Sequence, residues 1–346
     1  MRYGASPSNL LEWLAFALGQ VPLPVLDTIV PLLQARALMA AAEHGVLDAI
    51  AERARTSADL GLELGLDAEC VGLVLRVLQA MGYVAGDDGS WTLTSTGARH
   101  FGKGAAQSFD AFVRYGPAQY RMIDRIDDVL RTGKGIDFHD HHTPQEWTAY
   151  QRAMLDNARG FAWFVRDHLP VPGGAKSCLD IAGAHGMVGA ELCRKHPPMR
   201  ATVLDRPEAL ATARSIAEAG GWTDVVTFRE GNLLHDDFGA DVDVVLLCNV
   251  LHHFDASTNA LTLTRVRRAM KPGAVVGIFD IEPPEPHAAP DASADALALY
   301  FRITSTSTCF RGRDFVEWLS AAGFHDARIV RSVKMPSRVL VHARNL

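Results

Sequence analysis

The sequence predicts an α/β fold in which a doubly wound, mainly parallel sheet follows a smaller helical N-terminal domain. Strand-like and helix-like segments alternate from residue 173 onward. The Pro- and Gly-rich stretch Pro170–Gly174 separates this alternation from a helical region. Near the C-terminus, Arg328–Val333 and Arg338–His342 are joined by a link so short that they must pair antiparallel. We therefore expect a doubly wound sheet with an antiparallel last strand.

The first hundred residues have the pattern of helices followed by a small hairpin. Thr56 and Asp67 are suited to cap two short helices, and Gly86-Asp87-Asp88-Gly89 is typical of a hairpin turn. The expected helices are Leu10–Leu18, Leu32–Ile50 with a break near His44, the segment ending at Leu64, and Ala68–Met81; the expected strands are Tyr83–Ala85 and Trp91–Thr94. Helix, turn, helix and hairpin together indicate a winged-helix domain over residues 1–105. Apart from the hairpin, we expect this domain to be all-helical.

The charge of this segment argues against binding to DNA. Between Thr56 and His100 there are two basic and six acidic residues, a net charge of −4, whereas a recognition helix needs Lys and Arg. The candidate recognition helix Ala68–Met81 is mostly apolar, so we expect it to pack, and the domain to form a homodimer, without nucleic-acid partners. No apolar run reaches 18 residues, and the five scattered cysteines favour a reducing compartment, so we expect a cytoplasmic protein without membrane contact.

Two further segments complete the chain. Residues 106–172 are expected to be a helical connector rich in aromatic side chains that contributes to a substrate pocket, and residues 173–346 form the α/β domain. The strands expected in that domain are Cys178–Ile181, Ala201–Leu204, Val225–Phe228, Val242–Leu247 and Ala274–Ile281; the helices expected between them are Val188–Lys195, Pro207–Ala219 and Ser257–Met270.

The loop after the first of these strands has the properties of a nucleotide site. It reads Asp180-Ile-Ala-Gly183-Ala-His-Gly186, and small residues between a strand and a helix let a ligand approach the backbone. Asp205 ends the next strand, 19 residues after Gly186, where a carboxylate can accept hydrogen bonds from ribose hydroxyls. The loop does not match G-x-G-x-x-G, because alanine takes the place of its second glycine.

These segments, with Glu-Gly-Asn232-Leu, Asn-Val-Leu-His252-His-Phe and Lys-Pro-Gly-Ala, resemble class I S-adenosylmethionine-dependent methyltransferases with a Rossmann-like sheet. Together with the winged helix, nearly the whole chain resembles the O-methyltransferases of the plant caffeate and flavonoid type and their bacterial natural-product relatives. The resemblance implies S-adenosylmethionine as cofactor, a small-molecule acceptor, and a winged helix that serves in dimerisation. The cofactor residues that it implies are Asp180, Gly183, Gly186, Asp205, Arg206, Asn232, Leu233, Cys248 and Asn249. Cys248 replaces a basic residue of the family, and Asn232 an aspartate.

A histidine is suited to remove the proton of a phenol, because its pKa lies near neutrality. His252 follows the strand Val242–Leu247 at the carboxyl edge of the sheet, where open α/β sheets bind ligands. By the resemblance, His252 is the catalytic base and Asp280, 28 residues later, orients it. Cys309 stands where the family has a second supporting acid. A helix cap or a solvent-facing histidine pair is the alternative explanation of His252 and His253.

The acceptor pocket and the remaining histidines leave alternatives open. The residues expected to suit a flat aromatic acceptor are Trp147, Met154, Phe161, Phe164, His253 and Phe301, although core packing explains aromatic residues equally well. His139, His141 and His142 could hold a metal with a 2-oxo acid, but we expect them to be solvated loop residues, and assign no metal. C- or N-methylation on the same fold, and a non-catalytic regulator, remain alternatives to O-methylation.

Overall fold

The computed structural model describes residues 4–305 and 307–346. The chain divides into two compact units, residues 4–117 and Ala118–Leu346, with the boundary inside helix α7 (Asp110–Ile123). The expected connector over residues 106–172 consists of α7, α8 (Ile126–Thr132), the 3-10 helix η1 (Phe138–Asp140) and the long helix α9 (Pro144–His168).

The N-terminal unit has the predicted order of helices and hairpin. Its elements are α1 (Leu10–Ala17), α2 (Leu23–Glu43), α3 (Val46–Glu52), α4 (Ser57–Leu64), α5 (Ala68–Ala80), β1 (Val84–Asp87), β2 (Ser90–Leu93) and α6 (Ser95–Phe101). The predicted caps are present, because the side chain of Thr56 accepts from Asp59 N and that of Asp67 accepts from Cys70 N. The hairpin pairs Val84 with Leu93 antiparallel, so the unit is not entirely helical.

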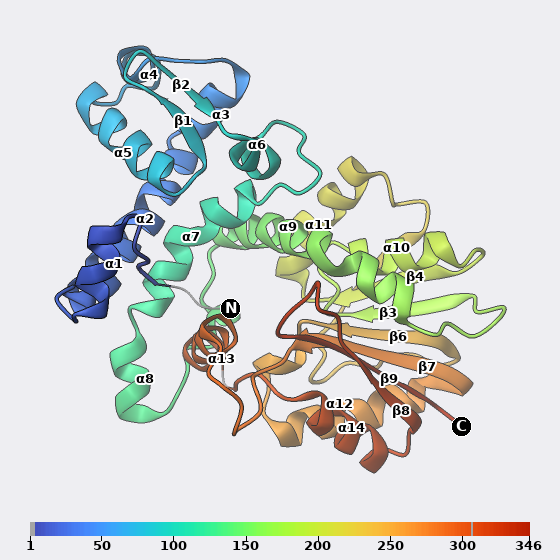
Figure 1. Ribbon diagram of the computed structural model, residues 1–346. Helices are drawn as coiled ribbons and strands as arrows, with labels where there is room; N and C mark the ends of the chain where they lie inside the picture. The colour runs from blue at the N-terminus through green and yellow to red at the C-terminus, as the bar shows by residue number, and fades with distance from the viewer. Residues whose placement is uncertain (1–3, 306) are drawn as a thin grey trace. The chain divides into compact units, whose positions relative to one another are not determined.

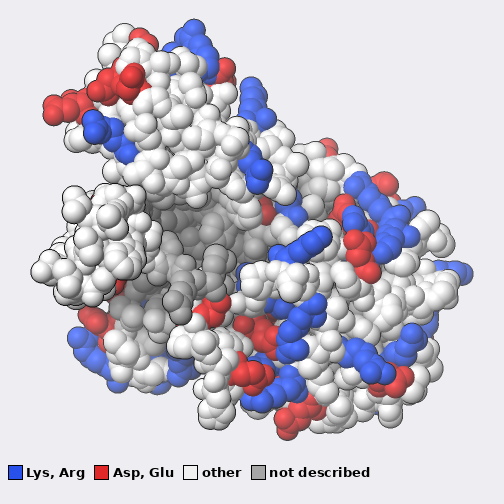
Figure 2. Space-filling model, viewed as in Figure 1, with Lys and Arg blue, Asp and Glu red and all other residues white. Residues whose placement is uncertain are grey.

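Helices α1 and α2 expose a large apolar surface. Helix α2 begins at Leu23 and not at Leu32, because Pro24 fits the first turn of a helix, where no backbone N–H is needed. Helix α1 has no buried residue, Leu11 is 79% exposed and Trp13 is 55% exposed. The surface over α1 carries few charged side chains (Figure 2). By length and composition α2 could cross a membrane. The sequence analysis did not predict this, because charged residues and prolines interrupt the apolar residues of the helix. A patch of this kind marks an interaction surface.

The second unit contains a sheet of seven strands in the order β5-β4-β3-β6-β7-β9-β8 (Figure 1). The strands are β3 (Ser177–Ile181), β4 (Arg200–Asp205), β5 (Val226–Glu230), β6 (Val242–Cys248), β7 (Met270–Ile281), β8 (His325–Val330) and β9 (Arg338–Arg344). The first five strands are parallel, whereas β9 pairs antiparallel with both β7 and β8. The predicted doubly wound sheet with an antiparallel last strand is therefore confirmed.

Helices cover both faces of this sheet (Figure 1). Helices α9, α10 (Met187–Lys195) and α11 (Pro207–Gly220) lie on one face, and α12 (Ala256–Ala269) and α14 (Gly312–Ala321) lie on the other. Along β6, Val244 and Leu246 belong to one core cluster and Val245 and Leu247 to the other, as alternating side chains require. With both faces buried, the loops at the carboxyl ends of the parallel strands are left to bind ligands.

Candidate active site

The loop after β3 makes a sharp turn at small residues. Ala182 and Ala184 both adopt left-handed backbone conformations, with φ of 55° and 51°. This conformation is unfavourable for alanine, so the surrounding structure must hold it. A Cβ on Gly183 would lie 2.5 Å from the carboxyl carbon of Asp180, so glycine is required there. The buried carboxylate of Asp180 also accepts from Gly189 N at 3.3 Å, and burial raises its pKa to about 7. Asp180 thus supports the loop from below.

Asp205 at the end of β4 is bound to this loop. One carboxylate oxygen accepts from the backbone N–H of Ala184 at 2.8 Å, and the other accepts from that of Arg206 at 2.8 Å. Burial outweighs these hydrogen bonds and raises the pKa of Asp205 to about 6. The carboxylate is therefore fixed in position before any ligand binds.

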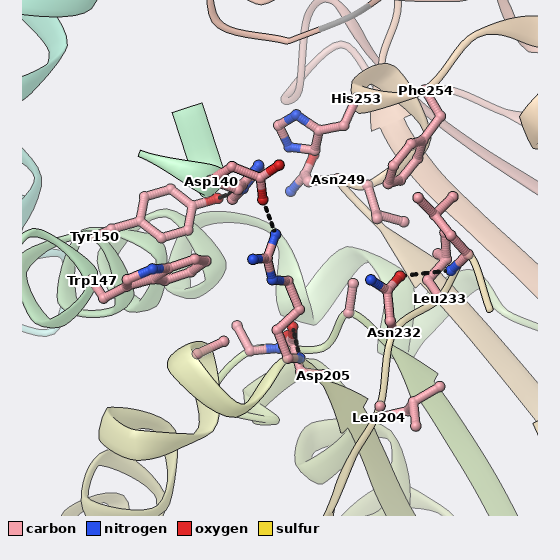
Figure 3. A pocket seen from close by; sticks show the side chains of 18 of the residues that line it. Asp140, Trp147, Tyr150, Leu204, Asp205, Asn232, Leu233, Asn249, His253 and Phe254 are labelled. Atoms are coloured by element: carbon pink, nitrogen blue, oxygen red, sulfur yellow. Dashed lines mark hydrogen bonds and ion pairs between the residues drawn. The ribbon is translucent and has the colours of Figure 1, made fainter. Parts of the chain in front are cut away.

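A cavity of about 300 Å³ opens above these loops (Figure 3). Seven of the residues predicted from the sequence line it: Trp147, Asp205, Arg206, Asn232, Leu233, Asn249 and His253. They come from α9, from the loops after β4 and β5, and from the segment after β6. Asn232 folds its own loop, since its side-chain oxygen accepts from Leu234 N at 2.8 Å. Side chains far apart in the sequence thus meet at the predicted edge of the sheet.

Other predicted residues lie outside the cavity wall. Phe161 and Phe164, expected in the substrate pocket, are buried in the core, and Phe161 stacks on Phe279 with ring centroids 4.5 Å apart. The residues Asp180, Gly183, Gly186, Cys248 and Met154 are also not among those that line the cavity. The thiol of Cys248 is desolvated, which raises its pKa well above the ordinary value, so it is an uncharged group.

The segment around η1 forms part of the cavity wall. Asp140 Oδ1 accepts an ion-pair hydrogen bond from Arg206 Nη1 at 2.7 Å, and the Arg206 guanidinium lies over the ring of Trp147 (Figure 3). His139 is half-buried against Trp147 and Tyr150, and burial lowers its pKa to about 3. His139 is therefore not the solvated residue that we expected, because η1 directs it inward. Among the described residues, no group of three or more His, Cys, Asp or Glu is placed to hold a metal ion.

His252 and Asp280 meet as the 28-residue spacing predicts. His252 lies in the 3-10 helix η2 (Leu251–His253) after β6, and Asp280 lies near the end of β7. His252 Nδ1 is 2.5 Å from Asp280 Oδ1, which also accepts from Ile281 N at 2.7 Å. His252 is 2% exposed and Asp280 is 0% exposed, and the ring of Phe301 covers the imidazole with centroids 3.8 Å apart. A buried carboxylate in contact with one ring nitrogen leaves the other free for a proton.

His253 occupies a different environment from its neighbour. Its Nδ1 lies 2.6 Å from Ser305 Oγ, its ring packs edge-on against His139, and it lines the cavity. Burial, helped by His252 and His139, lowers the pKa of His253 well below its usual range. His253 is therefore neutral at physiological pH. Sequence reasoning missed Tyr150, Gln151 and Asp140, which line the cavity, and Ser305, which contacts His253, because only the three-dimensional fold brings these residues together.

The cavity lies at the carboxyl edge of a doubly wound sheet, and comparisons with known proteins identify the class of protein. A profile of the O-methyltransferase domain matches residues 167–325. The chain is 32% identical over 250 residues to 3-amino-4-hydroxybenzoate 4-O-methyltransferase of Streptomyces cremeus, covering 69% of this chain and 67% of that protein. It is 25% identical over 321 residues to 3-hydroxy-5-methyl-1-naphthoate 3-O-methyltransferase of Streptomyces sahachiroi, covering 90% and 91%. Human N-acetylserotonin methyltransferase, solved with S-adenosylmethionine, has the same fold, with a TM-score of 0.81, 19% identity and 99% coverage of both chains.

The protein belongs to the S-adenosylmethionine-dependent O-methyltransferases, and it is similar to bacterial relatives that act on aromatic and polyketide natural products. The resemblance described from the sequence is therefore confirmed.

Proposed function

We propose that this enzyme transfers a methyl group from S-adenosylmethionine to a hydroxyl of a small aromatic or polyketide-like natural product, with His252 as general base. The observation that carries the proposal is the buried contact between His252 and Asp280. The names of the two Streptomyces relatives, which describe methylation of a hydroxybenzoate and a hydroxynaphthoate, favour an aromatic hydroxyl as acceptor.

The cavity residues fit the cofactor. Asp205 would accept hydrogen bonds from the ribose hydroxyls, and Asn232 and Leu233 would bind the adenine. The loop Ala182–Gly186 would lie beside the methionine end, held in place by Asp180. S-adenosylmethionine supplies a methyl group already activated on a positively charged sulfur.

The chain itself must orient the acceptor and remove its proton. A phenol has a pKa of about 10, so only about a thousandth is ionised at pH 7. His252 would take this proton on Nε2, the ring nitrogen that does not contact Asp280, while Asp280 holds Nδ1 and stabilises the imidazolium that forms. The ring of Phe301 covers His252, so it would either change its rotamer to admit the acceptor or form one wall of the acceptor pocket.

His253 is the alternative base, and one observation favours it: His253 lines the cavity and His252 does not. Its lowered pKa makes His253 a weak base, and the hydroxyl of Ser305 is a poorer partner than a carboxylate for a charged imidazole. We therefore assign the proton to His252 and a place in the acceptor pocket to His253.

The exposed apolar faces of α1 and α2 support a homodimer formed through the N-terminal unit. The resemblance to dimeric relatives favours a second copy of the chain as the partner that covers these faces. With the apolar residues covered in this way, we expect the protein to reside in the cytoplasm. No nucleic acid is expected as a partner, because α5 presents apolar residues and one arginine.

The decisive experiment is a methylation assay by mass spectrometry. Purified protein and S-adenosylmethionine are incubated with a panel of hydroxybenzoates, hydroxynaphthoates and 2-oxo acids. We expect a mass gain of one methyl group on an aromatic hydroxyl. Products methylated at carbon or nitrogen would contradict O-methylation, and binding of S-adenosylmethionine without any product across a broad panel would favour a regulator.

A further inference from the structure

Two side-chain amides in the cavity wall have buried oxygens without a hydrogen bond. Gln151 on α9 is 1% exposed, and in the part of the chain that the structure describes its Oε1 accepts no hydrogen bond. The same holds for Oδ1 of Asn249, directly after β6. Leaving such a group unsatisfied costs about 1–3 kcal/mol, so native proteins keep few of them. Both residues line the cavity, which makes a bound ligand the natural partner.

Gln151 lies against the loop that follows β3. Three residues further along α9, the backbone of Met154 is hydrogen-bonded by the imidazole of His185, the fourth residue of that loop. His185 also accepts from Met187 N at 3.2 Å, so this imidazole joins α9 to the start of α10. Gln151 is one helical turn from this contact, and shares the cavity wall with Ala182 and Ala184.

Asn249 also lies beside this loop. Residues Ile181 and Leu247 are paired neighbours in β3 and β6, so Asn249 follows β6 where the loop leaves β3. Its backbone N–H donates to Phe279 O at 2.7 Å, which fixes the residue with φ at 53°. Gln151 and Asn249 therefore share the cavity wall with residues of this loop. Asp205 lines the same cavity, where we place the ribose (Figure 3).

An amide both donates and accepts hydrogen bonds, so it suits a ligand group that carries both charges. The described lining residues include one Lys or Arg, Arg206, and it is paired with Asp140. We propose that Gln151 and Asn249 bind the amino-acid end of S-adenosylmethionine, where the α-ammonium donates to their oxygens and the α-carboxylate accepts from the Gln151 amide. The inference rests on the proposed function for its methyl donor. It adds a residue of α9 that no sequence motif indicated.

The unsatisfied amide of Gln151 leads to an unusual prediction for the melting temperature. Leucine is apolar and somewhat shorter than glutamine, so Gln151→Leu removes a buried polar oxygen that has no partner. We expect the ligand-free variant to melt at the same temperature as the wild type or higher, while its affinity for the cofactor falls. A residue with a merely structural hydrogen bond would show the opposite effect on melting.

Calorimetry with two ligands tests the assignment. S-adenosylhomocysteine carries the amino-acid end, and 5′-methylthioadenosine has the same nucleoside without it. Gln151→Leu should weaken S-adenosylhomocysteine about 10- to 100-fold, as for lost hydrogen bonds to charged groups, and change 5′-methylthioadenosine less than about twofold. Asn249→Gly, which keeps the left-handed backbone accessible, should show the same selectivity. Gln145→Leu, an exposed residue of the same helix, is the matched control and should change neither.

Equal weakening of both ligands, or no weakening of either, by Gln151→Leu would overturn the inference and leave the proposed function intact. Wild-type protein that binds neither ligand would overturn the donor assignment as well. Tight binding of both with no methylated hydroxyl would refute the proposed reaction alone.

Discussion

Replacement of Asp280 by asparagine tests the proposed base most directly, because it keeps the shape of the side chain and removes its charge. Asp280 Oδ1 lies 2.5 Å from His252 Nδ1, and Asp280 is 0% exposed, so water cannot take its place. A buried charge-assisted hydrogen bond contributes about 1.5–3 kcal/mol. If that energy stabilises the imidazolium of the transition state, Asp280→Asn should lower kcat/KM about 10- to 150-fold, at 1.36 kcal/mol per tenfold.

The assay is the initial rate of methyl transfer at saturating S-adenosylmethionine, at a pH below the pKa of the acceptor. His252→Ala should lower kcat about 10²- to 10⁴-fold, the range expected for a lost general base. Calorimetry with S-adenosylhomocysteine should show cofactor affinity nearly unchanged in both variants, because neither side chain lines the cavity. If Asp280→Asn stays within twofold of wild type, or if His253→Ala is the more damaging change, the base has been assigned to the wrong histidine.

Three other predictions concern the cofactor, the acceptor and assembly. Burial raises the pKa of Asp205 to about 6, and the proposed ribose contact requires the carboxylate, so cofactor affinity should fall about fivefold from pH 6 to pH 5 and stay flat above pH 7. The variant Asp205→Asn should bind the cofactor weakly and without this pH dependence. A flat profile for the wild type would contradict the assignment. Phe301→Leu should raise the KM of an aromatic acceptor about 2- to 10-fold with unchanged cofactor affinity, and a shift in cofactor binding alone would refute this role. Light scattering should give twice 37.6 kDa for wild type and 37.6 kDa for Leu11→Glu with Trp13→Glu, whereas a wild-type monomer would exclude the dimer.

The sequence predicted the central strands of the sheet well because β3, β4 and β6 are short, mostly apolar runs between clear turn signals. Val242–Leu247 was placed within one residue of β6 (Val242–Cys248), and Asp205 was placed at the end of β4. The predicted ends of strands were less accurate where pairing with a neighbouring strand determines them. Strand β7 begins at Met270 and not at Ala274, because Met270 pairs with Val242 across a bulge, an interaction that local residue preference does not encode.

The site was predictable at the ends of strands and unpredictable on helices. His252 follows β6 and Asp280 lies near the end of the neighbouring parallel strand β7, so their spacing was informative. Gln151, Tyr150 and Asp140 reach the cavity from α9 and η1, whose positions depend on long-range packing. Because this packing is not encoded locally, the aromatic residues of α9 did not indicate which face of the helix packs in the core. Phe161 and Phe164 face the sheet, and Trp147 and Tyr150 face the cavity.

The charges of the site are consistent with a positively charged methyl donor. Burial lowers the pKa of His139 to about 3 and that of His185 to about 4, and it lowers that of His253 well below its usual range. All three are therefore neutral at pH 7 and add no repulsion to a sulfonium, which at short range in a desolvated site would be substantial. In the mechanism that we propose, the new positive charge would form on His252, beside the carboxylate of Asp280, and neither residue lines the cavity. This separation would let one site hold a cationic donor and still accept a proton.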